Sequence, residues 1–265
     1  MTDTPVHLRY ATSASGVATL TLDYPERRNA MSAAMTEQWV SAIAQIEADP
    51  TVRAVLVTGE GDAFCSGGDT GWIGGDPDAS VTELRDRMMP FYRAWLSIRE
   101  LEIPTIAAIN GPAVGAGAAV ALACDIRVAS SRASFSVPFV KLGIHPGMAT
   151  TFLLADVAGA AVARDLLLTG RRIGAGEMAD LGIVTSVFDE SEFAAEAAAR
   201  AEALAAGAPI AARLTKVALR HGGAPTLDEA IQWEALAQPI TLATSDLQEG
   251  LAAQRERRPA IFRGR

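Results

Sequence analysis

The segment from Ile103 to Asp125, IPTIAAINGPAVGAGAAVALACD, carries no charged residue until its last position. Residues 105–109 are short and apolar enough for a buried strand. An Asn-Gly-Pro tripeptide then breaks the pattern, and the Ala-rich run to Cys124 favours a helix. We therefore expect a strand, a tight turn and a buried helix, and the rest of the chain must be arranged to cover them.

The start of this helix is suited to bind a ligand oxygen. The first N–H groups of a helix have no intrahelical partner and lie at the positive end of its dipole. Gly115 and Gly117 allow close approach to the backbone, so the N–H of Ala116 can form half of an oxyanion hole. Two alternatives are a membrane span, which the Asn-Gly-Pro break disfavours, and a Gly/Ala surface for helix packing, which stays open.

Composition limits the classes of partner. The 265 residues are 49% hydrophobic and 20% charged, which suits one large globular domain, or one domain with an appendage. A net charge of −8 disfavours nucleic acid and anionic membranes, so we expect neither as a partner. Two cysteines, Cys65 and Cys124, form no disulfide framework, and no apolar signal segment opens the chain. We predict a cytoplasmic protein without a metal site.

Short strands alternate with helices along most of the chain. Residues 6–12 and 17–23 predict a β-hairpin, and Ser32 is a suitable N-cap for a helix to about Ala48. The strand at 54–58 precedes a long Gly- and Asp-rich loop. Further strands are expected at 126–129, 134–137 and 183–188, and helices at 81–99, 148–157, 161–169, 177–181, 194–206, 210–221, 227–243 and 247–256. This pattern indicates repeated β-β-α units followed by a helical region, with a boundary near residues 190–205.

A second small-residue turn, FCSGGD at residues 64–69, also follows a buried strand. Two such turns can face one another and donate one backbone N–H each. An oxyanion hole requires this arrangement of two donors. The pair of turns is therefore a stronger indication of a ligand site than either turn alone.

With these two turns the chain resembles the crotonase superfamily, the enoyl-CoA hydratase/isomerase family. The matching motifs are PERRNAMS, AVLVTGEGDAFCSGGD, IPTIAAINGPAVGAGAAVALACDIRVAS, FVKLGIHPG, LLLTGRRIGAGEMADLGIV and RRPAIF. The resemblance implies an α/β fold, a crotonase-like spiral of repeated β-β-α units in residues 1–195. It also implies a C-terminal helical region in residues 196–265 for oligomerisation and part of the coenzyme A site. Homotrimers, or hexamers built as dimers of trimers, are expected.

The resemblance also implies the ligand, a coenzyme A thioester that is the substrate rather than a tightly bound cofactor. Its carbonyl would accept bonds from the backbone N–H groups of Gly68 and Ala116, the latter standing where the family usually has glycine. Arg28 matches a basic residue that meets the coenzyme A phosphates. The carbonyl of Ser66 matches one that binds the adenine amino group.

The acid–base residues of the family are missing at the matching positions. Its hydratases use two glutamates, which correspond here to Ala119 and Phe139. A third position, an aspartate in dienoyl isomerases and in the aryl-CoA dehalogenase, is Gly147. None of these side chains can exchange a proton, so the sequence argues against ordinary hydration, isomerisation and dehalogenation. Phe139 instead suggests an apolar or aromatic acyl pocket.

Other residues offer only partial replacements. His145 is the nearest titratable candidate, since its usual pKa suits acid–base work, although it can equally pack the connector. Tyr92, Trp72 and Trp95 either approach the acyl pocket or belong to the core. Cys65 has no basic neighbour in sequence, which disfavours a nucleophile.

These observations leave three alternative hypotheses for the function. The first is an acyl-CoA enzyme of the lyase/isomerase class with an atypical mechanism, for example decarboxylation of a malonyl-type thioester or thioester hydrolysis. The second is a non-catalytic acyl-CoA binding protein in lipid metabolism. The third is a conventional enoyl-CoA hydratase with unusual residues.

Overall fold

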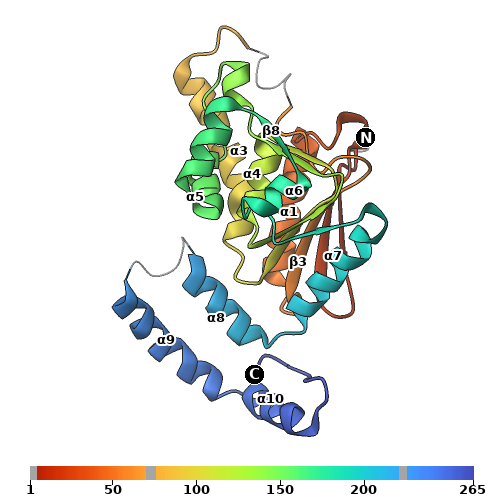
Figure 1. Ribbon diagram of the computed structural model, residues 1–265, viewed down its shortest axis with the longest axis vertical. Coiled ribbons are helices and arrows are strands. Elements are labelled where there is room, and N and C mark those ends of the chain that lie inside the picture. The colour runs from red at the N-terminus through yellow and green to blue at the C-terminus, as the bar shows by residue number, and fades with distance from the viewer. Residues whose placement is uncertain (1–4, 70–75, 221–225) are drawn as a thin grey trace.

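The computed structural model describes residues 5–69, 76–220 and 226–265, and Figure 1 shows their arrangement. A six-stranded sheet with the order β1-β2-β3-β4-β6-β9 forms the centre. Its first pair is the expected antiparallel hairpin, and all other neighbours are parallel. The strands are β1 (Leu8–Thr12), β2 (Val17–Leu22), β3 (Ala54–Gly59), β4 (Thr105–Ile109), β6 (Ile126–Ser130) and β9 (Ser186–Phe188).

A second sheet has three short strands in the order β5-β7-β8. β4 continues into β5 and then α4, and β6 continues into β7 and then α5, so each unit adds one strand to each sheet before its helix. This confirms the repeated β-β-α units. Neither β5 nor β8 was expected from the sequence. The strands are β5 (Pro112–Val114), β7 (Ser134–Ser136) and β8 (Arg172–Gly174).

The helices follow local signals in the sequence. The Ser32 hydroxyl accepts a hydrogen bond from the Met35 N–H (3.1 Å), which caps α1 as expected. Gly159 has non-helical dihedral angles and separates two helical segments within α5, close to the interruption expected there. The helices are α1 (Ala33–Ala48), α3 (Val81–Leu96), α4 (Ala116–Ala123), α5 (Thr150–Thr169), α6 (Ala175–Asp180), α7 (Glu190–Ala205), α8 (Pro209–Leu219), α9 (Leu227–Leu242) and α10 (Ser245–Glu256), with 3₁₀ turns at Pro25–Arg27, Ser97–Arg99 and Phe139–Leu142.

Both faces of the central sheet are buried. On one face Trp39 of α1 stacks on Trp95 of α3 with ring centroids 4.7 Å apart, within the larger core. On the other face α7 covers the sheet with Phe193 and a row of alanines. Every residue of β4 and α4 is buried, as their lack of charge predicts. No helix in the described ranges combines the length and apolar character needed to cross a membrane.

The C-terminal helices α8, α9 and α10 extend from one end of the core (Figure 1). The expected division between residues 195 and 196 falls inside α7, and the two-part organisation remains a prediction. α8 is attached through Lys216, whose Nζ donates to the Ile103 carbonyl (2.8 Å) and pairs with Asp125 (2.8 Å). Lys216 is only 8% exposed, and its two contacts join α8 to the first and last residues of the segment from Ile103 to Asp125.

Replacing Lys216 by alanine should lower the free energy of unfolding by about 2 kcal/mol, because the Ile103 carbonyl loses its donor and Asp125 its buried cation. Urea denaturation measures this change. Lys141→Ala, at an exposed lysine, is the control and should have little effect. Equal stability of both variants would show that Lys216 does not anchor α8.

Candidate active site: two glycine-rich turns beside an apolar cavity

The two small-residue turns lie in direct contact. The Val114 N–H donates to the Cys65 carbonyl (2.9 Å), and the N–H groups of Phe64 and Cys65 share the Pro112 carbonyl (3.1 and 3.2 Å). These bonds pair residues 64–65 with β5 in the manner of a short parallel strand. The pairing carries residues 66–68 to the beginning of α4.

Glycine is required where the turns meet. At Gly67, with φ of 95°, an added Cβ would lie 2.8 Å from the Val114 carbonyl oxygen and 3.2 Å from the Ala116 nitrogen. At Gly117 it would lie 2.4 Å from the Cys65 carbonyl oxygen. No side chain fits between the two backbones. Ala116 is the first residue of α4, so its N–H has no acceptor within the helix.

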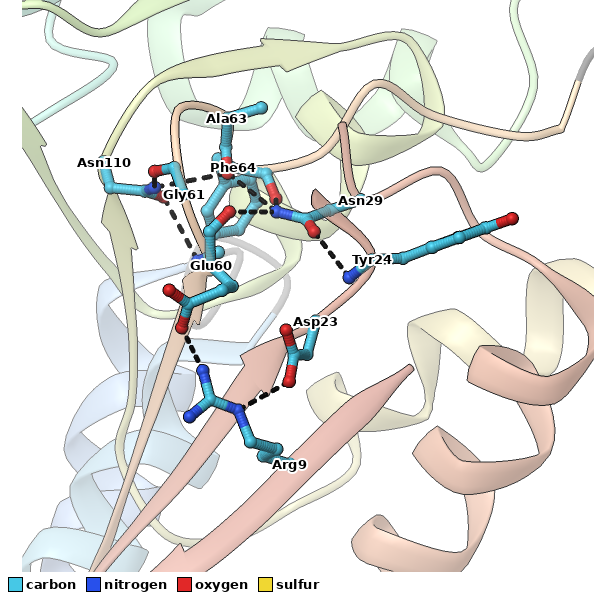
Figure 2. A network of polar contacts seen from close by, with 10 residues as sticks. Arg9, Asp23, Tyr24, Asn29, Glu60, Gly61, Ala63, Phe64 and Asn110 are labelled. Carbon is cyan, nitrogen blue, oxygen red and sulfur yellow. Dashed lines mark hydrogen bonds and ion pairs between the residues drawn. The ribbon is translucent and has the colours of Figure 1, made fainter. Parts of the chain in front are cut away.

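Two buried carboxamides fix the approach to the first turn, as Figure 2 shows. The side-chain NH₂ of Asn29 donates to the Ala63 carbonyl (2.8 Å), while its oxygen accepts from the Tyr24 N–H (2.8 Å). Asn110, at the end of β4, donates to the same Ala63 carbonyl (3.2 Å). Sequence reasoning did not assign this role to either asparagine. Together they hold residues 60–64, and hence the start of the glycine turn, against β4.

An apolar cavity of about 130 Å³ opens beside both turns. Gly68 lies at its edge with Ala116, and residues 138–148 form another wall. The structure therefore brings most of the sequence-derived candidates to one place. Those that line the cavity are Ser66, Gly68, Tyr92, Ala116, Phe139, His145 and Gly147. Ala119 lies further along α4 and is completely buried.

Comparisons with known proteins show the family of this chain. The family model described as enoyl-CoA hydratase/isomerase matches residues 12–265. The chain belongs to this family. It is 37% identical to a putative enoyl-CoA hydratase of Thermus thermophilus over 93% of this chain and 97% of the relative, and 35% identical to the 1,2-epoxyphenylacetyl-CoA isomerase of Escherichia coli over 94% and 96%. The crystal structure of an enoyl-CoA hydratase from Bacillus anthracis superposes with a TM-score of 0.91 at 32% identity, covering 98% of this chain and all of that one.

The space beside Gly147, the position expected to carry an aspartate in some relatives, is occupied by the side chain of Tyr92. A Cβ added at Gly147 would lie 2.4 Å from the Tyr92 hydroxyl oxygen. Tyr92 thus occupies the space that a side chain at residue 147 would need. Of the other aromatic candidates, Trp95 belongs to the core and Trp72 lies outside the described residues.

His145 lines the cavity but is exposed. Its Nδ1 lies 2.8 Å from the Pro146 carbonyl oxygen, which can only accept, so Nδ1 carries the proton. In the neutral ring, Nε2 is then the nitrogen that can accept a proton. The contact with its own connector agrees with a packing role, and the cavity agrees with an acid–base role, so both expectations for His145 remain.

Cys65 is not suited to nucleophilic chemistry. Its side chain is fully buried, and Sγ donates to the Asn29 carbonyl (3.0 Å). Burial raises the pKa of the thiol to about 12, so it stays protonated at neutral pH. The thiol therefore helps to hold the glycine turn through its bond to Asn29, and its burial agrees with the expectation that Cys65 is not a nucleophile.

The two residues expected to contact coenzyme A are adjacent. The Ser66 N–H donates to the Arg28 carbonyl (2.9 Å), and the Ser66 hydroxyl donates to the Arg27 carbonyl (3.2 Å). The Arg28 side chain is exposed, and its backbone has φ of 52°. A basic side chain and a backbone carbonyl are thus available next to the first glycine turn. The described residues contain no group of three or more side chains arranged to hold a metal ion.

Gly117→Ala should reduce the free energy of unfolding by about 2–3 kcal/mol, because the new methyl group forces the Cys65 backbone away from α4. Helix propensity alone predicts the opposite sign, since alanine is favoured over glycine by about 1 kcal/mol inside a helix. Thermal and urea unfolding decide between them. Gly176→Ala, inside α6 where an added Cβ has open space, is the matched control and should leave stability unchanged or raise it by up to about 1 kcal/mol. Unchanged or increased stability of Gly117→Ala would contradict the close contact.

Proposed function

We propose that this chain is an acyl-CoA enzyme whose Gly68 and Ala116 N–H groups bind the carbonyl oxygen of a coenzyme A thioester. The observation that carries the proposal is the contact between the two turns, which sets residues 66–68 beside the first N–H of α4 at the edge of a cavity. When a thioester becomes an enolate, negative charge develops on that oxygen. Two preorganised donors then stabilise the transition state, each by about 3 kcal/mol.

The proposed chemistry needs an enolate but little acid–base assistance. In this family the hydratase glutamates deliver a proton and orient a water molecule, whereas Ala119 and Phe139 can do neither. Decarboxylation of a malonyl-type thioester fits better. Its carbon–carbon bond breaks, carbon dioxide leaves, and the electron pair moves into the enolate that the two N–H groups stabilise. Thioester hydrolysis remains a second reaction that uses the same carbonyl site.

A non-catalytic acyl-CoA binding protein is the alternative. The lack of carboxylates favours this alternative, because Ala119, Phe139 and Gly147 stand at the three positions where the family resemblance predicts acidic residues. A binding protein would retain the two turns and the cavity but would turn over no thioester. Turnover of a panel of acyl-CoA esters, including malonyl-type and β-ketoacyl esters, separates the two functions.

We further propose that Arg28 pairs with coenzyme A phosphates, that the Ser66 carbonyl binds the adenine amino group, and that no cofactor other than the substrate thioester is held. The exposed Arg28 side chain beside the first turn supports this placement. A cytoplasmic homotrimer, or a hexamer of two trimers, is the proposed assembly. It is supported by α9, which exposes large apolar side chains, among them Leu227 (76% exposed) and Leu236 (71% exposed).

Wild-type protein should hydrate crotonyl-CoA at a negligible rate yet gain thermal stability from crotonyl-CoA, because a ligand that binds only the folded state raises the melting temperature. The double variant Ala119→Glu/Phe139→Glu should gain hydration activity, since it restores both carboxyl groups. Loss of the enoyl absorbance measures the reaction, with each single variant as a control.

Rapid hydration by the wild-type protein would contradict the proposed mechanism and support a conventional hydratase. Absence of stabilisation by any coenzyme A thioester would contradict both the enzyme and the binding protein. Decarboxylation of malonyl-CoA to acetyl-CoA would identify the reaction directly.

A further inference from the structure

The Tyr92 hydroxyl is a polar group in an otherwise apolar part of the cavity. Tyr92 extends from α3, and its hydroxyl oxygen lies against Gly147 in the connector before α5. The side chains around it in the cavity are largely apolar and include Met88, Phe91, Phe139, Ile144 and Met148. Such a group can orient a ligand because it is one of few hydrogen-bonding side chains that the acyl group meets.

This hydroxyl has no hydrogen-bond partner among the residues that the structure describes. The hydroxyl is not among the fully buried polar atoms, so water can bind it in the free protein, and an acyl group that fills the cavity displaces this water and must supply an acceptor in its place. Burial also raises the pKa of Tyr92, so the phenol keeps its proton at neutral pH. It therefore acts as a hydrogen-bond donor rather than as a base.

The glycine at residue 147 is a condition for this placement. The Cβ of any larger residue at position 147 would lie 2.4 Å from the Tyr92 hydroxyl oxygen, which is too close for both atoms to keep their positions. Tyr92 and Gly147 are thus a matched pair, although they come from α3 and from the connector before α5. The space that a side chain at residue 147 would occupy therefore holds the uncharged hydroxyl of Tyr92 from α3.

The position of the donor defines which ligand atom it meets. In the proposed function, Gly68 and Ala116 hold the thioester oxygen at one edge of the cavity, and the acyl chain must fill the remainder. A volume of about 130 Å³ is small compared with the roughly 300–1,000 Å³ of common ligand pockets, so it suits a short chain. An acceptor on that chain is then the partner available to Tyr92.

We propose that Tyr92 determines substrate specificity by donating a hydrogen bond to a second oxygen, carried on a short acyl chain such as a β-ketoacyl group. This inference rests on the proposed binding of a coenzyme A thioester. It adds the class of acyl group and the residue that selects it. Tyr92 binds and orients the ligand, and no bond is made or broken at its hydroxyl.

Binding of two esters with the same four carbons tests the proposal. Acetoacetyl-CoA carries a β-keto oxygen that butyryl-CoA lacks. Isothermal titration gives the ratio of their dissociation constants in the wild-type protein and in Tyr92→Phe, which removes only the hydroxyl. The preference for acetoacetyl-CoA should fall by about five- to tenfold in Tyr92→Phe, with butyryl-CoA affinity nearly unchanged.

Two further variants make the test specific. Gly147→Ala should reduce the same preference, because the new methyl group displaces the Tyr92 oxygen. Tyr10→Phe is the matched control, since Tyr10 lies in β1 and its hydroxyl contacts Thr12 (3.1 Å) away from the cavity; its ratio should equal that of the wild-type protein.

The outcomes separate the two proposals. If both esters bind and Tyr92→Phe leaves their ratio unchanged, the specificity proposal is overturned while the proposed function stands. An equal loss of affinity for both esters assigns Tyr92 a structural role and also overturns it. If neither ester binds the wild-type protein, the proposed function fails, and the specificity proposal fails with it.

Discussion

The site depends on one backbone contact, the pairing of residues 64–65 with β5 through the carbonyls of Cys65 and Pro112. The contact is possible because Gly67 and Gly117 have no side chains to separate the two turns. It places the beginning of α4 next to residues 66–68, which no contact within either turn can do. Since the ligand groups are backbone N–H groups, their positions are fixed by the fold and need no side-chain ordering when a ligand binds.

The rest of the structure holds this contact in place. β3 and β4 pair in parallel, so the segments that follow them leave the same edge of the sheet. Asn29 and Asn110 then tie the first of these segments down through the Ala63 carbonyl. The complete burial of α4 keeps its axis fixed.

Local patterns predicted much of the fold, but not the contacts between distant segments. The hairpin, the Ser32 cap and the charge-free strand and helix all appear where their residue patterns placed them. β5 and β8 were missed because each follows directly on a turn, at Asn110-Gly111 and at Gly170, and has no longer apolar or alternating run around it, whereas the equally short β7 and β9 lie within such runs.

The site was predictable to a similar extent. The sequence predicted that the two small-residue turns face each other, and the family resemblance predicted which residues bind the thioester. The contact of Tyr92 with Gly147 was not predictable, because it joins residues 55 positions apart and depends on how α3 packs over the cavity. The bonds from Asn29 and Asn110 to the Ala63 carbonyl were missed for a related reason, since an asparagine in a loop usually bonds to its own turn rather than to a distant one.

The central claim is that two backbone N–H groups polarise a thioester carbonyl, and infrared difference spectroscopy tests it directly. The measurement uses butyryl-CoA labelled with ¹³C at the carbonyl, bound to the wild-type protein and compared with the free ester in water. Two donors from Gly68 and Ala116 predict a carbonyl stretch at lower wavenumber in the bound ester. A bound ester whose carbonyl stretch stays at or above its value in water would contradict the account.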